Sequence, residues 1–462
     1  MTADIPGWDV SNQPSFQGWS AEAVYQDLVR NDLHGKPQPD AATSWKLNSN
    51  NTSVTYQLRP GMKFTDGTPV DATAVKKSFE YAATHGGQAA RLAEFKITTS
   101  GPLAVTITAD KPDEGLAGIG GFKLASPKYL AAGNVNKAPV GSGPYKLDQA
   151  ATTAGSVYTF TKNDAYWDPK AFPYKKLVLK VVKNQTAALN ALKTGQIDGT
   201  LIDQSMYKEA TASGLKVVGM RGNTTRLLLT DHQGKKIPAL GSLDVRRAMN
   251  MVFDKKAMVE DFYQGRADPA YQIFRPGSAA YIKDLKEPYP YNVAKAKELM
   301  KKAGFEEGFT LTFPMFEGLG MEKLVPVVAQ QLSVLNIRVE QKLLSGPKAV
   351  EELLSGKYPA PLWPLGNYAN SLQDINDYVK VDGIWNVMHQ PDPTVAKLTK
   401  QLSSAQGQEA VKIQQEINRY IIDQAWFVPM AYPDGFYAYS PKISVPRSTD
   451  ANALNPRLWD FK

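Results

Sequence analysis

The chain has 462 residues, of which 43% are hydrophobic and 21% are charged, so it can bury large cores and extensive disorder is excluded. It contains no cysteine, which excludes disulfides, thiolate metal sites, iron–sulfur clusters and cysteine nucleophiles. The 53 basic and 45 acidic residues give a net charge of +8, but the basic residues are scattered, so a nucleic-acid partner is not expected.

β-Strands are predicted where polar and apolar residues alternate or where short apolar runs occur. Such segments lie, in chain order, at residues 54–58, 105–108, 157–160, 177–182, 226–230, 310–313 and 338–340. Apolar residues at helical spacing predict helices at 185–194, 323–335 and 409–424, and after the capping residues Asp71, Asp244 and Asn292. Gly195 and Gly304 stand where helices are expected to end. Because strands and helices alternate, the sequence predicts an α/β fold.

No catalytic, metal-binding or cofactor-binding motif appears in the sequence. The histidines His34, His85, His232 and His389 include no i, i+4 pair that could form a zinc-binding helix. The segment 141–145 (GSGPY) has the glycines of a phosphate loop, but it lacks the Lys-Ser/Thr and its proline removes an amide donor, which predicts a turn. A Ser-His-Asp triad or a pair of catalytic carboxylates stays open, because their members need not be neighbours in sequence. We predict no catalytic residue, no cofactor and no metal, with an extracellular hydrolase as the alternative of another class.

Aromatic residues on predicted loops are the feature that favours ligand binding. The chain has 8 Trp and 21 Tyr, and several lie in stretches rich in Gly, Pro or Asn, namely Trp8, Trp19, Trp363, Tyr368 and Trp385. Aromatic and amide side chains on loops suit the reversible binding of a small ligand in a cleft. The same rings could also cover the edges of a hydrophobic core, so this pattern leaves both roles open.

Eight motifs that follow one another in order carry a family resemblance. They are residues 25–29 (YQDLV), 39–45 (PDAATSW), 55–70 (TYQLRPGMKFTDGTPV), 139–145 (PVGSGPY), 163–167 (NDAYW), 188–198 (ALNALKTGQID), 244–250 (DVRRAMN) and 289–303 (YPYNVAKAKELMKKA). The third is very close to the family signature T-Y-x-F-x-L-R-x-G-V-K-F-x-D-G-x-P, and the fourth matches the turn P-V-G-T-G-P-Y. Together they resemble the extracellular solute-binding proteins of peptide/nickel-type ABC importers, family 5.

The resemblance implies an α/β, two-lobed periplasmic-binding-protein-like fold of type II, in the large form with an extra subdomain and a hinge between the lobes. The implied organisation is lobe 1 at 1–35, its extra subdomain at 36–148, lobe 1 again at 149–228, lobe 2 at 229–428 and the return to lobe 1 at 429–462. Ligand binding would shift an open population of such a protein toward a closed one.

The implied function is that of the substrate-binding component of an ABC importer, which captures a peptide-like or other small solute and delivers it to a membrane permease. The expected partners are a small-molecule or oligopeptide ligand and an ABC permease, with no nucleic acid, and the expected state is a monomer. The implied location is extracytoplasmic, either periplasmic or lipid-anchored at the outer face of the cell membrane. Met1–Asp4 lacks the features of a secretory signal, so we expect a trimmed lipoprotein with an added Met1, although composition alone would also allow a cytosolic protein.

The segment 363–374 (WPLGNYANSLQD) departs from the family pattern. Peptide-binding members carry a G-W-x-x-D-Y-x-D-P stretch, in which a carboxylate pairs with the α-ammonium of the peptide. Here Asn367 and Asn370 occupy the two acidic positions, and Asp374 or Asp377 could replace them only if the loop shifts. A neutral oligosaccharide or a blocked peptide is therefore the alternative ligand. The residues predicted to bind ligand are Trp8, Trp19, Trp363, Gly366, Asn367, Tyr368, Asn370, Asp374, Trp385 and Asn386.

Overall fold

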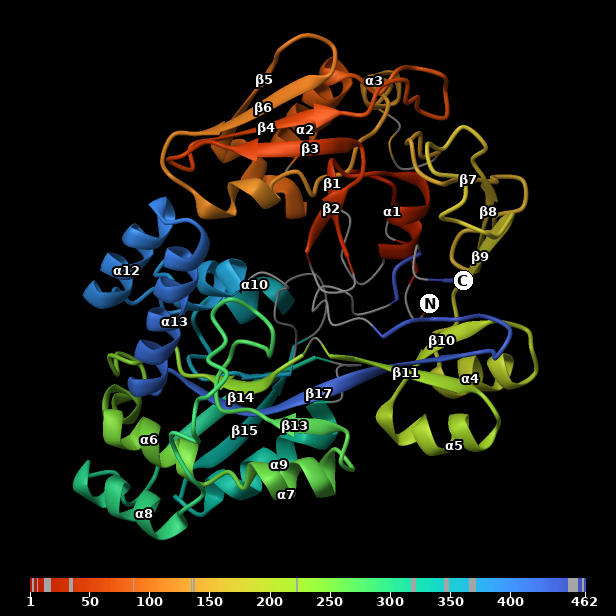
Figure 1. Cartoon of the computed structure of the whole chain (residues 1–462). Helices are drawn as coiled ribbons and strands as arrows, with labels where there is room; N and C mark the ends of the chain where they lie inside the picture. Colours follow the sequence, from red (N-terminus) through yellow and green to blue (C-terminus); the bar gives the residue numbers. More distant parts are fainter. Residues whose placement is uncertain are drawn as a thin grey trace. The chain divides into compact units, whose positions relative to one another are not determined.

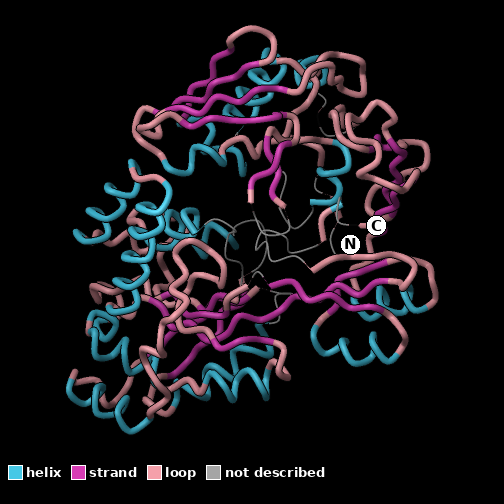
Figure 2. The backbone as a smooth tube through the Cα atoms, viewed as in Figure 1, coloured by secondary structure: helices cyan, strands magenta, loops and turns pink. Residues whose placement is uncertain are grey.

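The computed structural model describes residues 1, 4–5, 7–11, 18–32, 36–85, 87–133, 135, 138–221, 223–316, 321–344, 349–364, 371–447, 456–458 and 461–462. The chain folds into two compact units, unit 1 (Met1–Met220 and Gly435–Lys462) and unit 2 (Arg221–Asp434). Helices and strands are interleaved in both units (Figure 2), as the α/β prediction requires.

Unit 1 contains most of the antiparallel strand pairs. Its strands are β1 (Val29–Asn31), β2 (Pro37–Pro39), β3 (Ala42–Leu47), β4 (Ser53–Leu58), β5 (Phe95–Thr99), β6 (Ala104–Ala109), β7 (Tyr145–Leu147), β8 (Val157–Lys162), β9 (Lys176–Lys180), β10 (Gly199–Ile202) and β11 (Lys216–Arg221). Its helices are α1 (Gly18–Val24), α2 (Ala72–His85), α3 (Pro127–Ala131), α4 (Gln185–Lys193) and α5 (Tyr207–Ala212).

A four-stranded antiparallel sheet, with the order β3-β4-β6-β5, lies within the segment predicted as the extra subdomain (Figure 1). Alternate residues of β4 are buried, among them Val54 and Tyr56, as the alternating sequence predicts. Helix α2 packs on this sheet, and its Phe79 shares a hydrophobic core with both residues. The side chain of Asp71 accepts a hydrogen bond from the backbone N–H of Ala74 (2.8 Å), so the predicted cap of α2 is confirmed.

Besides the antiparallel β1-β2 pair, two further sets of strands complete unit 1. One is an antiparallel sheet with the order β7-β8-β9, and in the other β10 pairs with the end of β17 (Phe427–Tyr439). Helix α4 lies between β9 and β10 in sequence and is followed by Gly195, whose φ of +73° is the left-handed conformation of a helix C′ residue. The predicted end of this helix is therefore confirmed.

Unit 2 carries the larger share of the helices. Its strands are β12 (Thr225–Leu228), β13 (Ala267–Pro269), β14 (Thr310–Met315), β15 (Arg338–Leu343), β16 (Leu362–Trp363) and the first part of β17. Its helices are α6 (Leu243–Met251), α7 (Lys255–Ala257), α8 (Val293–Lys302), α9 (Met321–Ser333), α10 (Ala349–Leu354), α11 (Ser371–Asp374), α12 (Pro393–Ser404) and α13 (Gly407–Asp423). Within the described parts of both units, no helix has the length and apolar character needed to span a membrane.

The core of unit 2 is built around a parallel strand pair. Strands β14 and β15 pair in parallel, with Leu311 opposite Val339, and parallel neighbours need a crossover connection, which α9 supplies. Phe313 of β14 and Val328 of α9 are both fully buried in this core. Strand β12 lies between β16 and β17 and pairs antiparallel with both.

One helix cap in unit 2 is as predicted and one is not. The side chain of Asn292 accepts from the backbone N–H of Lys295 (2.8 Å) and caps α8. Asp244 is not a cap, because α6 begins at Leu243 and Asp244 lies in its first turn. There its carboxylate pairs with the Nζ of Lys302 on α8 (2.8 Å), and a negative charge in the first turn still complements the helix dipole.

His232 should make the stability of unit 2 depend on pH. Its ring stacks on Trp426, with centroids 4.2 Å apart, and burial, reinforced by the charge of Arg246, lowers its pKa from 6.5 to about 4. Between these two pH values the unfolded chain binds a proton that the folded chain does not, so the free energy of unfolding falls as the pH drops. We expect a loss of about 2 to 3 kcal/mol over this window.

Urea unfolding at pH 7, 5.5 and 4 measures this effect, and His232→Phe should flatten the pH dependence because phenylalanine stacks but binds no proton. The exposed His85 provides the matched control, and His85→Phe should leave the pH dependence as it is. An unchanged slope in His232→Phe would show that other groups are responsible.

Candidate functional site

A buried cluster in unit 2 combines an arginine, a carboxylate and three aromatic rings. We call it the Arg226 cluster, and its members are Arg226, Trp363, Asp374, Tyr378 and Trp385. They come from β12, β16, the end of α11, the π-helical turn 375–379 and the loop that follows this turn. Segments more than a hundred residues apart thus contribute to one site.

Arg226 is the central charged residue of the cluster and is completely buried. It lies opposite Trp363 in the pairing of β12 with β16, and its Nη1 donates to the backbone carbonyl of Thr224 (2.9 Å). Its guanidinium carbon lies 4.4 Å from the centroid of the Tyr378 ring, which is a cation–π contact. Because a charge is rarely buried without compensating groups, this arginine indicates a polar site within a fully buried strand.

The three aromatic rings pack against one another, and Tyr378 links them to the guanidinium group. The centroids of Trp363 and Trp385 are 4.6 Å apart with an angle of 42° between their planes, and Tyr378 lies nearly parallel to Trp385 at 6.2 Å. Burial raises the pKa of Tyr378 to about 12, although the positive charge of Arg226 acts in the opposite direction. The Tyr378 phenol, which is hydrogen-bonded to Trp363, therefore stays uncharged at neutral pH.

Asp374 brings a negative charge to the same ring. It ends α11 and is fully buried, and its charge contributes to the raised pKa of Tyr378. The charges of Arg226 and Asp374 thus shift the pKa of the Tyr378 phenol in opposite directions. A cation and an anion next to closely packed aromatic rings match the chemistry of a ligand that carries both charges and an apolar part.

Asn386 supports the loop that carries Trp385. It is 2% exposed, and its side-chain amide donates to the backbone carbonyl of Lys380 (2.9 Å). The backbone N–H of Trp385 donates to the carbonyl of Asp377 (2.8 Å). These bonds give Asn386 a role in holding the loop, while its predicted contact with a ligand stays a prediction.

The structure brings part of the predicted site together. Four predicted residues lie in or beside the Arg226 cluster, namely Trp363, Asp374, Trp385 and Asn386. Gly366, Asn367, Tyr368 and Asn370 lie outside the described residues. Arg226 was not among the predicted site residues, and the signal that could have found it is a charged residue directly before the apolar run 227–229 of a predicted strand.

Trp8 lies in the core of unit 1. Its exposed fraction is 4%, and its ring packs edge-on against Tyr158 at 6.3 Å and Phe160 at 6.1 Å. Its backbone carbonyl accepts a hydrogen bond from the hydroxyl of Tyr25 (2.7 Å). These contacts match the core role that the sequence left open for this residue, and its ligand-binding role stays a prediction.

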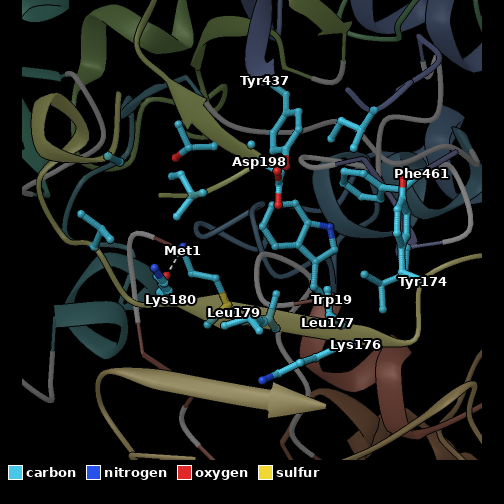
Figure 3. A pocket seen from close by; sticks show the side chains of 18 of the residues that line it. Met1, Trp19, Tyr174, Lys176, Leu177, Leu179, Lys180, Asp198, Tyr437 and Phe461 are labelled. Atoms are coloured by element: carbon cyan, nitrogen blue, oxygen red, sulfur yellow. Dashed lines mark hydrogen bonds between the residues drawn. The ribbon is translucent and has the colours of Figure 1, made fainter. Parts of the chain in front are cut away.

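Trp19 lines a pocket of about 250 Å³ within unit 1. Figure 3 shows its ring between Tyr437 and the β9 residues Leu177 and Leu179. The Trp19 and Tyr437 rings meet edge-on at 5.8 Å, and the Trp19 indole N–H donates to the carbonyl of Pro456. Trp19 therefore belongs to a different unit from the Arg226 cluster.

Comparison with known families tests the resemblance of the motifs. The family model described as bacterial extracellular solute-binding proteins, family 5 Middle, matches residues 36–380. The chain belongs to this family. The family predicted from the eight motifs is therefore confirmed.

Curated relatives of the family are similar over much of the chain. The glutathione-binding protein GsiB of Escherichia coli (strain K12) is 26% identical over 351 residues, which cover 72% of this chain and 66% of GsiB. The chain thus spans about 66% of the length of this curated relative.

Solved structures share the fold at low sequence identity. NikA from Brucella suis, in complex with Fe(III)-EDTA, has a TM-score of 0.85 and 20% identity, and covers 100% of this chain and 98% of its own. The periplasmic binding protein DppA from Helicobacter pylori, in complex with peptide STSA, has a TM-score of 0.81 and 21% identity, and covers 99% and 96%. These similarities confirm the predicted two-lobed periplasmic-binding-protein-like fold class.

Proposed function

We propose that this protein is the substrate-binding component of an ABC importer, which captures a peptide-like or other small solute between its two lobes and delivers it to a membrane permease. The observation that carries the proposal is the family match over residues 36–380. The two-unit fold supports it, because binding proteins of this kind close two lobes around a ligand. The relatives are binding proteins, and we propose that this chain likewise acts without catalysis.

The Arg226 cluster supports a ligand that carries charges of both signs. In a peptide, Asp374 would pair with the α-ammonium group and Arg226 with a carboxylate, while Trp363 and Trp385 would contact apolar parts. A relative named for glutathione and one solved with peptide STSA agree with a peptide-like ligand. Asp374 would then take the place of the acidic residues that Asn367 and Asn370 replace.

A neutral oligosaccharide is the second candidate ligand. The two asparagines at the family's acidic positions favour it, and so do the closely spaced rings of Trp363 and Trp385, which could stack on sugar faces. The charged residues Arg226 and Asp374 favour the peptide-like ligand instead, because a peptide carries an ammonium group and a carboxylate that match their charges.

We propose the finer features of the family for this chain as well. The protein would be a monomer outside the cytoplasm, either periplasmic or lipid-anchored, and its lobes would follow the predicted division at 228–229 and 428–429. Hinge bending between the lobes would couple ligand binding to delivery.

Ligand screening tests the proposal directly. Native mass spectrometry of the purified protein is expected to show a bound small molecule, and thermal unfolding is expected to shift upward with at least one of glutathione, tri- and tetrapeptides or oligosaccharides. The shift should grow with ligand concentration as mass action requires, by about 2.7 kcal/mol at a hundredfold excess over Kd.

Chromatography of the same mixtures serves as the control for catalysis. Recovery of intact ligand after long incubation is the expected result, and release of cleavage products would support the hydrolase alternative. If none of the ligand classes stabilised the protein and no ligand were found in it, the proposed function would be contradicted.

A further inference from the structure

Polar side chains interrupt the apolar face of α13, which is drawn in blue in Figure 1. Ile413, Ile417 and Ile421 of this helix lie in the core of unit 2. Gln414 and Asn418 lie four residues apart on the same side of the helix, and they are only 2% and 0% exposed. Because burying an amide costs free energy unless it is hydrogen-bonded, each of these two side chains needs specific partners.

Gln414 is bonded to the first residue of α11. Its Oε1 accepts a buried hydrogen bond from the hydroxyl of Ser371 (2.7 Å). The Oγ of Ser371 in turn accepts from the backbone N–H of Ala280 (3.1 Å), in the loop before α8. Ser371 is only 1% exposed, so bulk water cannot replace either partner. One hydroxyl therefore joins α13, the start of α11 and this loop.

Two neighbouring amides of α13 bind the same loop. The side-chain amide of Asn418 donates to the carbonyl of Ala280 (2.8 Å). The side-chain amide of Gln415 donates to the carbonyls of Ala279 (3.2 Å) and Tyr281 (3.4 Å). Among the described residues, neither of these amides is bonded to α11. Of the three amides, Gln414 is therefore the one that holds α11.

The anchored end of α11 is close to the carboxylate of the candidate site. Ser371 and Asp374 are the first and last residues of α11, so about one helical turn separates the hydroxyl from the carboxylate. The π-helical turn that follows carries Tyr378. A helix of four residues has few backbone bonds of its own, so its position depends on the bond that Gln414 makes to its first residue.

We propose that Gln414 is a positioning residue for the ligand site, because it holds the carboxylate of Asp374 in place through the hydroxyl of Ser371. This inference rests on the proposed function, in which Asp374 pairs with the ammonium group of a peptide. The strength of such a pair depends on the exact position of its atoms. Loss of the bond from Ser371 to Gln414 therefore weakens the binding of peptides with a free amino terminus and spares peptides without one.

The test compares the whole chain with its Gln414→Met variant, in which a side chain of similar length lacks the acceptor oxygen. Calorimetric titration with the tripeptide Ala-Phe-Ala should show binding that is weaker by about 10-fold in the variant. The N-acetylated tripeptide has no ammonium group, so both proteins should bind it equally. The matched control is Gln415→Met, which removes a neighbouring amide but leaves Ser371 its partner, and it should change neither affinity.

A role that acts through Asp374 predicts that two substitutions are not additive. In a chain that already carries Asp374→Asn, Gln414→Met should weaken the binding of Ala-Phe-Ala no further. Ser371→Ala is a second variant that removes the same bond with a smaller change in volume. It should reproduce the 10-fold loss, and it keeps the test decisive if Gln414→Met does not fold.

A measurement without ligand separates this inference from the proposed function. The amide of Lys380 donates to the carbonyl of Ile375 (3.0 Å) at the end of the same helical segment. Its hydrogen exchange should become about 10-fold faster in Gln414→Met and stay unchanged in Gln415→Met. Faster exchange in a chain that binds neither tripeptide would contradict the peptide ligand alone. Unchanged exchange, or equal weakening of the free and acetylated tripeptides, would overturn the role of Gln414.

Discussion

Gly141→Ala is expected to destabilise unit 1 by about 3 to 5 kcal/mol, a large part of the stability of a typical domain. A Cβ atom at this position would lie 1.9 Å from the carbonyl oxygen of Val24 and 2.7 Å from Cδ1 of Tyr25. The first of these atoms belongs to the backbone at the end of α1, so the clash cannot be relieved by a side-chain rotation. A hydrogen bond also holds segment 141–143 against the end of α1, because the N–H of Gly143 donates to the carbonyl of Val24 (3.0 Å).

Calorimetric unfolding measures this loss, and Gly118→Ala is the matched control. A Cβ atom at Gly118 would meet no atom within 4 Å, so this variant should change the stability by less than about 0.5 kcal/mol. Equal unfolding temperatures for the two variants would contradict the prediction, because they would show that there is room for a Cβ atom between Gly141 and the end of α1. The glycines of segment 141–145 are thus explained by close packing of the backbone.

Asp374→Asn is expected to weaken the binding of a peptide with a free amino terminus by about 30- to 100-fold, which corresponds to roughly 2 to 3 kcal/mol. The carboxylate is fully buried in the Arg226 cluster, and its replacement by a neutral group of the same shape removes the charge that would pair with an ammonium group. Calorimetric titration of the variant and the unchanged chain with the same peptide measures the effect.

Two controls separate this effect from damage to the fold. The N-acetylated form of the peptide has no ammonium group, so its weaker binding should be the same in both proteins. Asp382→Asn changes a largely exposed carboxylate on the loop after the 375–379 turn and should leave the affinity within twofold. If Asp374→Asn bound the free peptide with unchanged affinity, Asp374 would not be the ammonium partner, and an oligosaccharide would become the favoured ligand.

Local sequence patterns predicted the secondary structure well where one side of an element is buried. The alternation in 54–58 and the parallel strand at 310–313 both appear as strands, and Asp71 and Asn292 cap helices because their short side chains reach free backbone N–H groups. Asp244 shows the limit of this reasoning. Ser242 precedes the helix, and a pattern of residue types cannot decide between two possible starting points that lie so close together.

The site was less predictable from sequence because its members are brought together by long-range strand pairing. Trp363, Asp374 and Trp385 were predicted as ligand-binding residues, since they lie in a segment rich in aromatic and polar residues. Arg226 was missed, because its partner Trp363 is reached only through the antiparallel pairing of β12 with β16.

The sequence by itself determined the family, the α/β class and the absence of cysteine chemistry, since these depend on composition, periodicity and motifs that are local along the chain. Only the tertiary structure decided which residues meet. It placed Trp8 in the core of unit 1 and Trp19 in a pocket of unit 1, and it brought Arg226 and Asp374 close enough to Tyr378 in unit 2 for both charges to affect its pKa. The physical reason is that burial and pairing are properties of contacts between distant segments, and side chains of the same type take different roles according to those contacts.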